Sequence, residues 1–191
     1  VGLVDVKRAP IERITPDGIR TTDAHYALDA IIFATGFDAM TGTLLAIDVQ
    51  GPDGYTLKDA WADGPATYLG LMVAGLPNLF MINGPGSPSV KANMIVGLEQ
   101  HTDWIMGLID HLRSTGLNRV EANAPAQTAW VQHTREVAEA TLMPRADSWY
   151  VGANVPGKAR VFMPYVGGFP KYVDICERVV DGGYEGFATA S

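Results

Sequence analysis

The most informative stretch of the chain, residues 79–94, reads LFMINGPGSPSVKANM. Its first four residues are an apolar run of strand length, typical of a strand buried on both faces of a parallel sheet. A bend rich in glycine and proline follows at residues 83–89, and a long amphipathic pattern begins after it. The order of strand, glycine-rich turn and helix indicates an α/β fold, in which ligands bind beyond the carboxyl ends of the strands. The bend is therefore the first candidate for a binding site.

Segments upstream of this stretch extend the α/β pattern. The turn Thr15-Pro16-Asp17-Gly18 predicts a hairpin between two short strands, at residues 11–14 and 19–22. A second apolar run at residues 30–34 predicts another buried strand. Between the two buried runs, the many turn-forming residues of 40–75 predict short strands and loops.

Three helices are expected downstream of the bend. The apolar spacing predicts a long helix that begins near Met94 and closes at Gly116, a second over residues 126–142 that Pro144 stops, and a third over residues 171–181. A complete doubly wound sheet needs about five strands, and this chain shows only a pair of good core strands. We therefore expect an incomplete doubly wound α/β fold.

Composition excludes several classes of partner. The 191 residues are 47% hydrophobic and 18% charged, which is typical of a globular protein. With 14 basic and 21 acidic residues, the formal net charge of −7 disfavours nucleic acid and anionic membranes as partners. No apolar run approaches the roughly 20 residues of a membrane helix. The single cysteine, Cys176, allows neither an internal disulfide nor a cysteine-based metal site, so we expect a buried thiol and a reducing, cytoplasmic setting.

The bend at residues 83–89 has the chemistry of a ligand platform. Gly84 and Gly86 let a flat or anionic ligand approach the backbone, and Ser89 can cap the following helix, whose N-terminus carries a partial positive charge. The pattern departs from the dinucleotide fingerprint because Ser89 stands where Gly or Ala belongs. Ser87 also lacks glycines on both sides at the spacing of a hydrolase nucleophile. From the residues alone, a capped loop without a ligand stays an equal alternative.

The histidines and one tryptophan complete the set of candidates. His101 and His111 lie ten positions apart on one expected helix and point in different directions, so they cannot share a metal, and no metal site is expected. We expect both to be ordinary surface or half-buried histidines. Trp149 stands in a polar loop punctuated by glycine, residues 148–158, which predicts either a mobile lid or a loop anchored on the core by its tryptophan.

Seven stretches together resemble the C-terminal portion of the type I Baeyer–Villiger monooxygenases, in the order and spacing of that family. They are ATGFDAMTG (34–42), GPATYLG (64–70), PNLF (77–80), GPGSPSVKANM (84–94), SWYVGANVPGK (148–158), VGG (166–168) and YEGF (184–187). The resemblance implies an FAD enzyme that uses NADPH and O2 to convert a ketone into an ester or lactone through a flavin C4a-peroxide. It also implies a C-terminal part of a flavoprotein with two dinucleotide-binding domains. Residues 1–36 would end the NADP-binding domain, and residues 37–191 would belong to the FAD-binding domain.

The resemblance also assigns roles by position. The residues expected beside the flavin are Gly84, Pro85, Gly86, Ser87 and Met94. Met94 would bring its backbone N–H to the flavin pyrimidine carbonyl and its side chain to the substrate pocket. The expected pocket residues are Ser89, Val90, Lys91 and Met94. Trp149 and Lys158 would belong to a control loop over NADP, residues 148–158, which Lys158 closes.

Two positions depart from the family pattern. Lys91 stands where an apolar residue is expected, which alters substrate preference unless the lysine extends to solvent. The run Pro144-Arg145-Ala146-Asp147 replaces a more neutral segment before the control loop, which puts the hinge of that loop in doubt.

Several parts of the family pattern lie outside this sequence. Both Gly-x-Gly-x-x-Gly motifs, the Phe-x-Gly-x-x-x-His-x-x-x-Trp fingerprint and the active-site Arg are not found in it. The resemblance places that Arg upstream of Val1, so no catalytic residue is assigned here, and the missing N-terminal part of the same polypeptide is an expected partner. The chain alone is predicted neither to hold FAD nor to oxidise ketones. Two alternatives remain: an N- or S-oxygenating flavin monooxygenase, and a non-catalytic nucleotide-binding module.

Overall fold

The structure is a computed structural model that describes residues 1–89 and 92–191. The backbone divides into two compact units, Val1–Gly36 and Phe37–Ser191. The assignment of these units to an NADP-binding and an FAD-binding domain stays a prediction.

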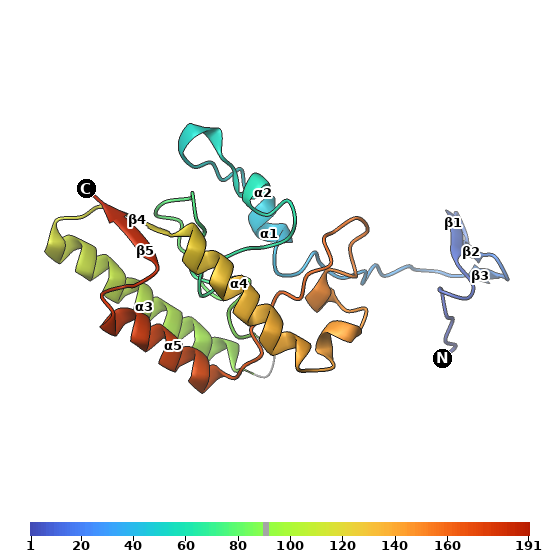
Figure 1. The fold of residues 1–191 in the computed structure, drawn as a ribbon. Helices are drawn as coiled ribbons and strands as arrows, with labels where there is room; N and C mark the ends of the chain where they lie inside the picture. The colour runs from blue at the N-terminus through green and yellow to red at the C-terminus, as the bar shows by residue number, and fades with distance from the viewer. Residues whose placement is uncertain (90–91) are drawn as a thin grey trace. The chain divides into compact units, whose positions relative to one another are not determined.

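The first unit contains a three-stranded antiparallel sheet in the order β1–β2–β3 (Figure 1). β1 (Ile11–Thr15) and β2 (Gly18–Thr21) form the expected hairpin, with Thr15 paired to Gly18. This pairing confirms the hairpin prediction. The two-residue loop between the strands sets their register. β3 (His25–Ala27) pairs with β2 and was not predicted.

The two apolar runs that predicted buried strands are not strands in this structure. Residues 30–34 are irregular, and Ile32 is 90% exposed. Residues 79–82 are irregular as well, although Met81 is buried. Both predictions are wrong for the same reason. A strand forms where a neighbour completes its hydrogen-bond ladder, and an apolar run does not supply that neighbour.

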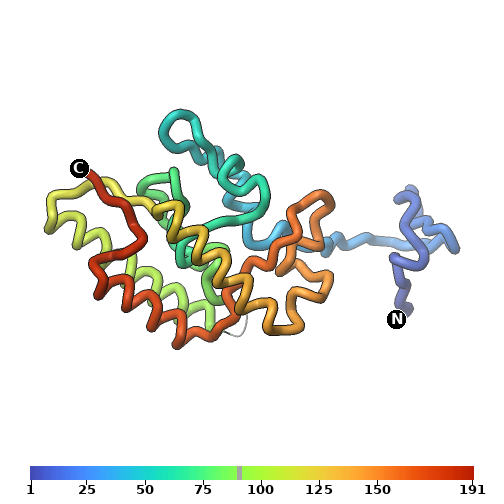
Figure 2. Tube along the Cα trace, viewed as in Figure 1, coloured from blue at the N-terminus to red at the C-terminus, as the bar shows by residue number. Residues whose placement is uncertain are grey.

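The second unit is built around three helices, α3 (Met94–Thr115), α4 (Ala124–Glu139) and α5 (Phe169–Asp181). α3 and α5 lie side by side (Figures 1 and 2), and Trp104 Nε1 of α3 donates to the carbonyl oxygen of Cys176 in α5 (3.1 Å). The three helix predictions are confirmed, with shifted ends. α3 closes at Gly116, which has a left-handed φ of 72°. α4 ends before Pro144 is reached.

Shorter elements precede, connect and follow the three long helices. Residues 40–75 contain α1 (Gly42–Leu45) and α2 (Leu57–Ala60) rather than the expected short strands. In α2, Thr56 and Asp59 form a capping box, which is a local helix signal that the prediction missed. β4 (Arg119–Ala122) pairs antiparallel with β5 (Phe187–Ala190) and brings the C-terminal segment beside the α3–α4 connection. All strand pairs in the described residues are antiparallel.

The main core lies where α3, α5, β4 and residues 69–72 meet. Its buried members are Leu69, Leu71, Met72, Trp104, Ile105, Leu108, Leu112, Val120, Ala122, Trp130, Tyr165, Tyr172, Cys176, Val179 and Tyr184. A smaller cluster packs under α2 and contains Leu57, Trp61, Val73, Leu76 and Met81. The expected burial of Cys176 is confirmed. None of the helices in the described part of the chain has the length and apolar character that crossing a membrane requires.

Candidate functional site

Two hydrogen bonds from distant segments hold Gly86 at the centre of the bend. Its N–H donates to the carbonyl oxygen of Met163 (2.7 Å), and its carbonyl oxygen accepts from Trp130 Nε1 (3.1 Å). Gly86 has a φ of 85°, and a Cβ there would lie 2.8 Å from Thr67 Oγ1. Only glycine meets both conditions without strain.

The residues next to Gly86 are also held by hydrogen bonds and close packing within the protein. Thr67 Oγ1 donates to the carbonyl oxygen of Pro85 (2.6 Å). Ser87 is fully buried, and its Oγ donates to the carbonyl oxygen of Gly84 (2.7 Å). A Cβ at Gly84 would lie 2.5 Å from the carbonyl oxygen of Gly70. The bend is therefore a rigid platform whose own polar groups are largely engaged within the protein.

Ser89 does not cap α3, so its expected capping role is wrong. The cap is Asn93, whose Oδ1 accepts from the N–H of Ile95 (3.0 Å). The helix begins at Met94, too far along the chain for Ser89 to reach its first N–H groups. Ser89 Oγ is buried and has no hydrogen-bond partner among the described residues.

Two of the expected pocket residues, Val90 and Lys91, lie outside the residues that the structure describes. Their expected roles, and that of Ser89, stay predictions.

Met94 occupies the first position of α3, where a backbone N–H has no acceptor within the helix. Its side chain is exposed, and its carbonyl oxygen accepts from Asn83 Nδ2 (3.3 Å). The bend and the start of the helix are thus tied together. The positive end of the helix dipole and an available N–H lie at the same point, which suits a ligand atom carrying negative charge.

His101 is fully buried, so the expectation of a surface or half-buried histidine is wrong. Its Nδ1 accepts from the N–H of Asn83 (2.9 Å), and its Nε2 lies 2.8 Å from the hydroxyl of Tyr172. Burial lowers the pKa of His101 to about 4 and raises the pKa of Tyr172 well above its usual value. The signal was present in the sequence, because His101 falls on the same helix face as Trp104, Ile105 and Leu108.

The loop of residues 148–158 is partly ordered by a short 3-10 turn, Trp149–Val151. Val151 is 8% exposed, whereas Trp149 is 42% exposed and contacts Tyr150 in a tilted arrangement with ring centroids 3.8 Å apart. The residue that anchors the loop on the core is therefore Val151, and Trp149 is available at the surface. Its expected contact with NADP stays a prediction.

Lys158 joins the end of this loop to the segment that follows Gly36. Its Nζ pairs with Asp38 Oδ1 and donates to the carbonyl oxygen of Ala39 (3.0 Å). Asn154 Nδ2 donates to the carbonyl oxygen of Phe37 (2.8 Å). These contacts engage the Lys158 amine within the protein, and its expected role in closing the loop over NADP stays a prediction.

A single residue connects the two loops that sequence reasoning identified. The N–H of Met163 donates to the carbonyl oxygen of Tyr150 (2.9 Å), and its own carbonyl oxygen accepts from Gly86 (2.7 Å). A cavity of about 920 Å³ is lined by Gly86, Val151 and Met163 among others. Fold geometry thus brings the glycine bend and the 148–158 loop into one region.

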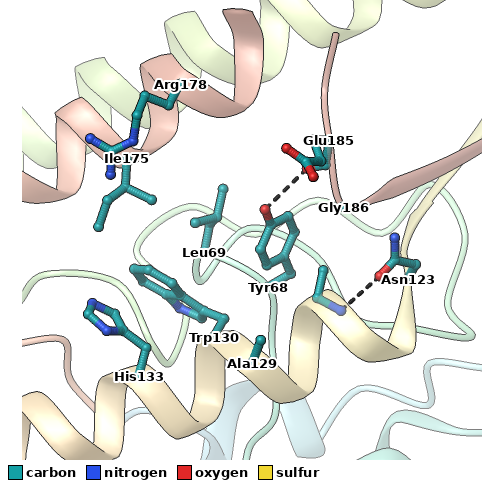
Figure 3. A pocket seen from close by; sticks show the side chains of 11 residues that line it. Tyr68, Leu69, Asn123, Ala129, Trp130, His133, Ile175, Arg178, Glu185 and Gly186 are labelled. Atoms are coloured by element: carbon teal, nitrogen blue, oxygen red, sulfur yellow. Dashed lines mark hydrogen bonds between the residues drawn. The ribbon is translucent and has the colours of Figure 1, made fainter. Parts of the chain in front are cut away.

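A second, shallower groove of about 570 Å³ lies elsewhere and contains none of the described site residues predicted from sequence (Figure 3). Tyr68, Trp130 and His133 form an aromatic wall, and Arg178 and Glu185 stand at its rim. Within the described ranges, no group of three His, Cys, Asp or Glu side chains could hold a metal ion.

Known proteins resemble this chain in sequence and in structure. No protein-family model matches the chain. An acetone monooxygenase (methyl acetate-forming) from Gordonia sp. (strain TY-5) is 46% identical over 98% of this chain and 36% of its own length. A Baeyer–Villiger monooxygenase from Pseudooceanicola batsensis is 42% identical over 96% of this chain and 34% of its own length. The crystal structure of the OTEMO complex with FAD and NADP matches with a TM-score of 0.90 at 40% identity, over 98% of this chain and 34% of that chain.

The fold is that of a portion of a monooxygenase, with mixed α and β structure. More narrowly, the chain is related to the Baeyer–Villiger monooxygenases along nearly its whole length. It spans about a third of the length of the curated relatives that it matches. The expected fold class, a C-terminal part of a two-domain flavoprotein, is thereby confirmed.

Proposed function

We propose that this chain forms the flavin-facing part of an FAD- and NADPH-dependent Baeyer–Villiger monooxygenase that converts ketones into esters or lactones with O2. The observation that carries the proposal is the link through Met163 between Gly86 and Tyr150. It joins the loop assigned to the flavin to the loop assigned to NADP. Bound FAD and NADPH would supply the redox chemistry, and the residues of this chain would position them.

The bend and the start of α3 suit a flat, electron-rich ring. Gly84 and Gly86 let the bend pack closely on Gly70, Thr67 and Trp130, and the hydrogen bonds from Gly86 to Trp130 and Met163 hold it in place. The N–H of Met94 can donate to a flavin carbonyl, and the helix dipole stabilises negative charge there. The rigid wall, which also includes Pro85 and Ser87, would exclude water from one side of the ring.

The other assignments follow from this arrangement. Trp149, exposed at the surface of its loop, would cover NADP, and Lys158 would hold the loop closed through Asp38. Ser89, whose buried hydroxyl has no hydrogen-bond partner within residues 1–89 and 92–191, would contribute to the ketone pocket beside Met94. The further partner would be the N-terminal part of the same protein. A buried single cysteine fits a reducing cytoplasm.

A chimera tests this function directly. The matching third of the Gordonia acetone monooxygenase is replaced by this chain, and the purified chimera is examined for FAD content and for NADPH oxidation with ketones, amines and sulfides. We expect stoichiometric FAD and ester or lactone products from ketones. Oxygenation of only amines or sulfides would favour the N- or S-oxygenating alternative, and a folded chimera without FAD would refute the proposal. Separately, the 191-residue chain alone is expected to form no tight yellow complex with FAD.

A further inference from the structure

A continuous line of hydrogen bonds runs from the bend into the core. The N–H of Asn83 donates to His101 Nδ1 (2.9 Å), His101 Nε2 lies 2.8 Å from the Tyr172 hydroxyl, and that hydroxyl donates to the carbonyl oxygen of Leu69 (2.7 Å). His101, Tyr172 and Leu69 are all fully buried. The line therefore couples the backbone of the bend to buried groups of α3 and α5.

The direction of every bond in the line follows from its two ends. A backbone N–H can only donate, so His101 Nδ1 must be the unprotonated acceptor. A backbone carbonyl can only accept, so the Tyr172 proton points to Leu69. The neutral histidine therefore carries its proton on Nε2 and donates it to Tyr172. Only this one tautomer satisfies all four groups.

The residue at the start of the line is held in an uncommon conformation. Asn83 has a φ of 53°, in the left-handed region. Its side chain reaches the first turn of α3, where Nδ2 donates to the carbonyl oxygen of Met94. Its Oδ1 packs against Gly97, and a Cβ placed on Gly97 would lie only 3.0 Å from it. Asn83 thus sets the spacing between the bend and the helix N-terminus, and His101 holds Asn83.

The far end of the line returns to the same bend. Leu69 precedes Gly70. The carbonyl oxygen of Gly70 would lie 2.5 Å from a Cβ placed on Gly84, and the N–H of Gly70 donates to Thr67 Oγ1 (3.1 Å). Thr67 in turn binds Pro85. The bend is therefore held at Asn83 and at Pro85 by one connected set of buried groups.

We propose that His101 is a positioning residue that sets the glycine bend at the distance from the N-terminus of α3 that a flavin ring requires. The inference rests on the proposed function for the identity of the ring. The position of the bend itself is a property of this chain and is measured without any cofactor.

The first experiment uses the chain itself. A long-range 1H–15N spectrum is expected to show His101 protonated at Nε2 and bare at Nδ1 at neutral pH. In His101→Phe, amide exchange at Asn83 is expected to accelerate about tenfold or more, which corresponds to the loss of one buried hydrogen bond. His111→Phe is the matched control on the same helix, and it should leave exchange at Asn83 unchanged. His101→Asn, whose amide oxygen can replace Nδ1 as acceptor, should restore most of the protection.

The second experiment uses the chimera. His101→Phe is expected to weaken FAD binding about tenfold, with His111→Phe as control and His101→Asn restoring most of the affinity. The opposite tautomer, or unchanged exchange at Asn83 in folded His101→Phe, would overturn the positioning role. If the spectrum is as expected but FAD affinity does not change, the link to the flavin is wrong. If the unmutated chimera holds no FAD, the proposed function fails, and the exchange data still decide what His101 does. Should His101→Phe not fold, the opposite tautomer in the unmutated chain would still overturn the positioning role.

Discussion

The indole Nε1 of Trp130 donates a 3.1 Å hydrogen bond to the carbonyl oxygen of Gly86, so helix α4 holds the glycine bend directly. The two residues are 44 positions apart in the sequence. The bond places a buried aromatic side chain behind the backbone that we assign to the flavin, and it leaves no room on that side of Gly86 for a side chain.

Gly86→Ala should therefore be costly. The added Cβ would lie 2.8 Å from Thr67 Oγ1 and 3.2 Å from Trp130 Nε1, and the residue would keep a φ of 85°. We expect a loss of about 2–4 kcal/mol in the free energy of unfolding, measured by urea denaturation. Gly157→Ala is the matched control, since Gly157 has a φ of 79° with open space around it. It should lose only about 1 kcal/mol. Equal losses would show that the close packing at Gly86 is unimportant.

The stability of the chain should depend on His101 in mildly acidic solution. Burial lowers the pKa of His101 from 6.5 to about 4, so between these values the unfolded chain binds a proton that the folded chain does not. The contribution is fully present above about pH 6.5 and declines as the pH falls toward 4, by up to ~3 kcal/mol. Tyr172 and Cys176, which face this region, stay neutral throughout because burial raises the pKa of both.

The measurement compares unfolding free energies of the unmutated chain and His101→Asn from pH 7 to pH 4.5. The difference between the two should shrink as the pH falls. A constant difference for His101→Asn would contradict a buried neutral histidine.

Breaking the pair between Lys158 and Asp38 should loosen the control loop. Lys158→Met and Asp38→Asn are each expected to speed limited proteolysis within residues 148–158, and a double-mutant cycle should give a coupling of about 1 kcal/mol. The control is the pair between Arg160 and Asp147 (3.2 Å), in which both side chains are largely exposed. Its coupling should be near zero, because solvent screens exposed ion pairs. Equal coupling in the two pairs would mean that Lys158 does not hold the loop.

The thiol of Cys176 should be unreactive in the folded chain. It is fully buried in α5, and burial raises its pKa to about 12, so almost no thiolate is present at neutral pH. A thiol reagent is expected to label it only as fast as the chain unfolds, with full labelling in urea. Stoichiometric labelling under native conditions would show that this part of the core opens.

Local signals carried the predictions that succeeded. Pro16, Asp17 and Gly18 favour a turn through their own backbone preferences, so the hairpin followed from them. The apolar spacing of α3, α4 and α5 repeats within a few residues, and Gly116 marks an end that needs no distant partner. The order and spacing of the motifs identified the family, although they did not describe how those motifs meet.

The sequence by itself thus determined the three long helices, the hairpin, the buried cysteine and the relationship to Baeyer–Villiger monooxygenases. Only the tertiary structure decided that residues 30–34 are irregular and have no partner strand in the part of the chain that is described, that Asn93 rather than Ser89 caps α3, and that His101 faces Asn83. The physical reason is that strand pairing, burial of a polar side chain and closure of a loop each need a second group supplied by a distant part of the chain. Periodicity shows that a residue can be buried, and the path of the whole backbone selects what it meets there.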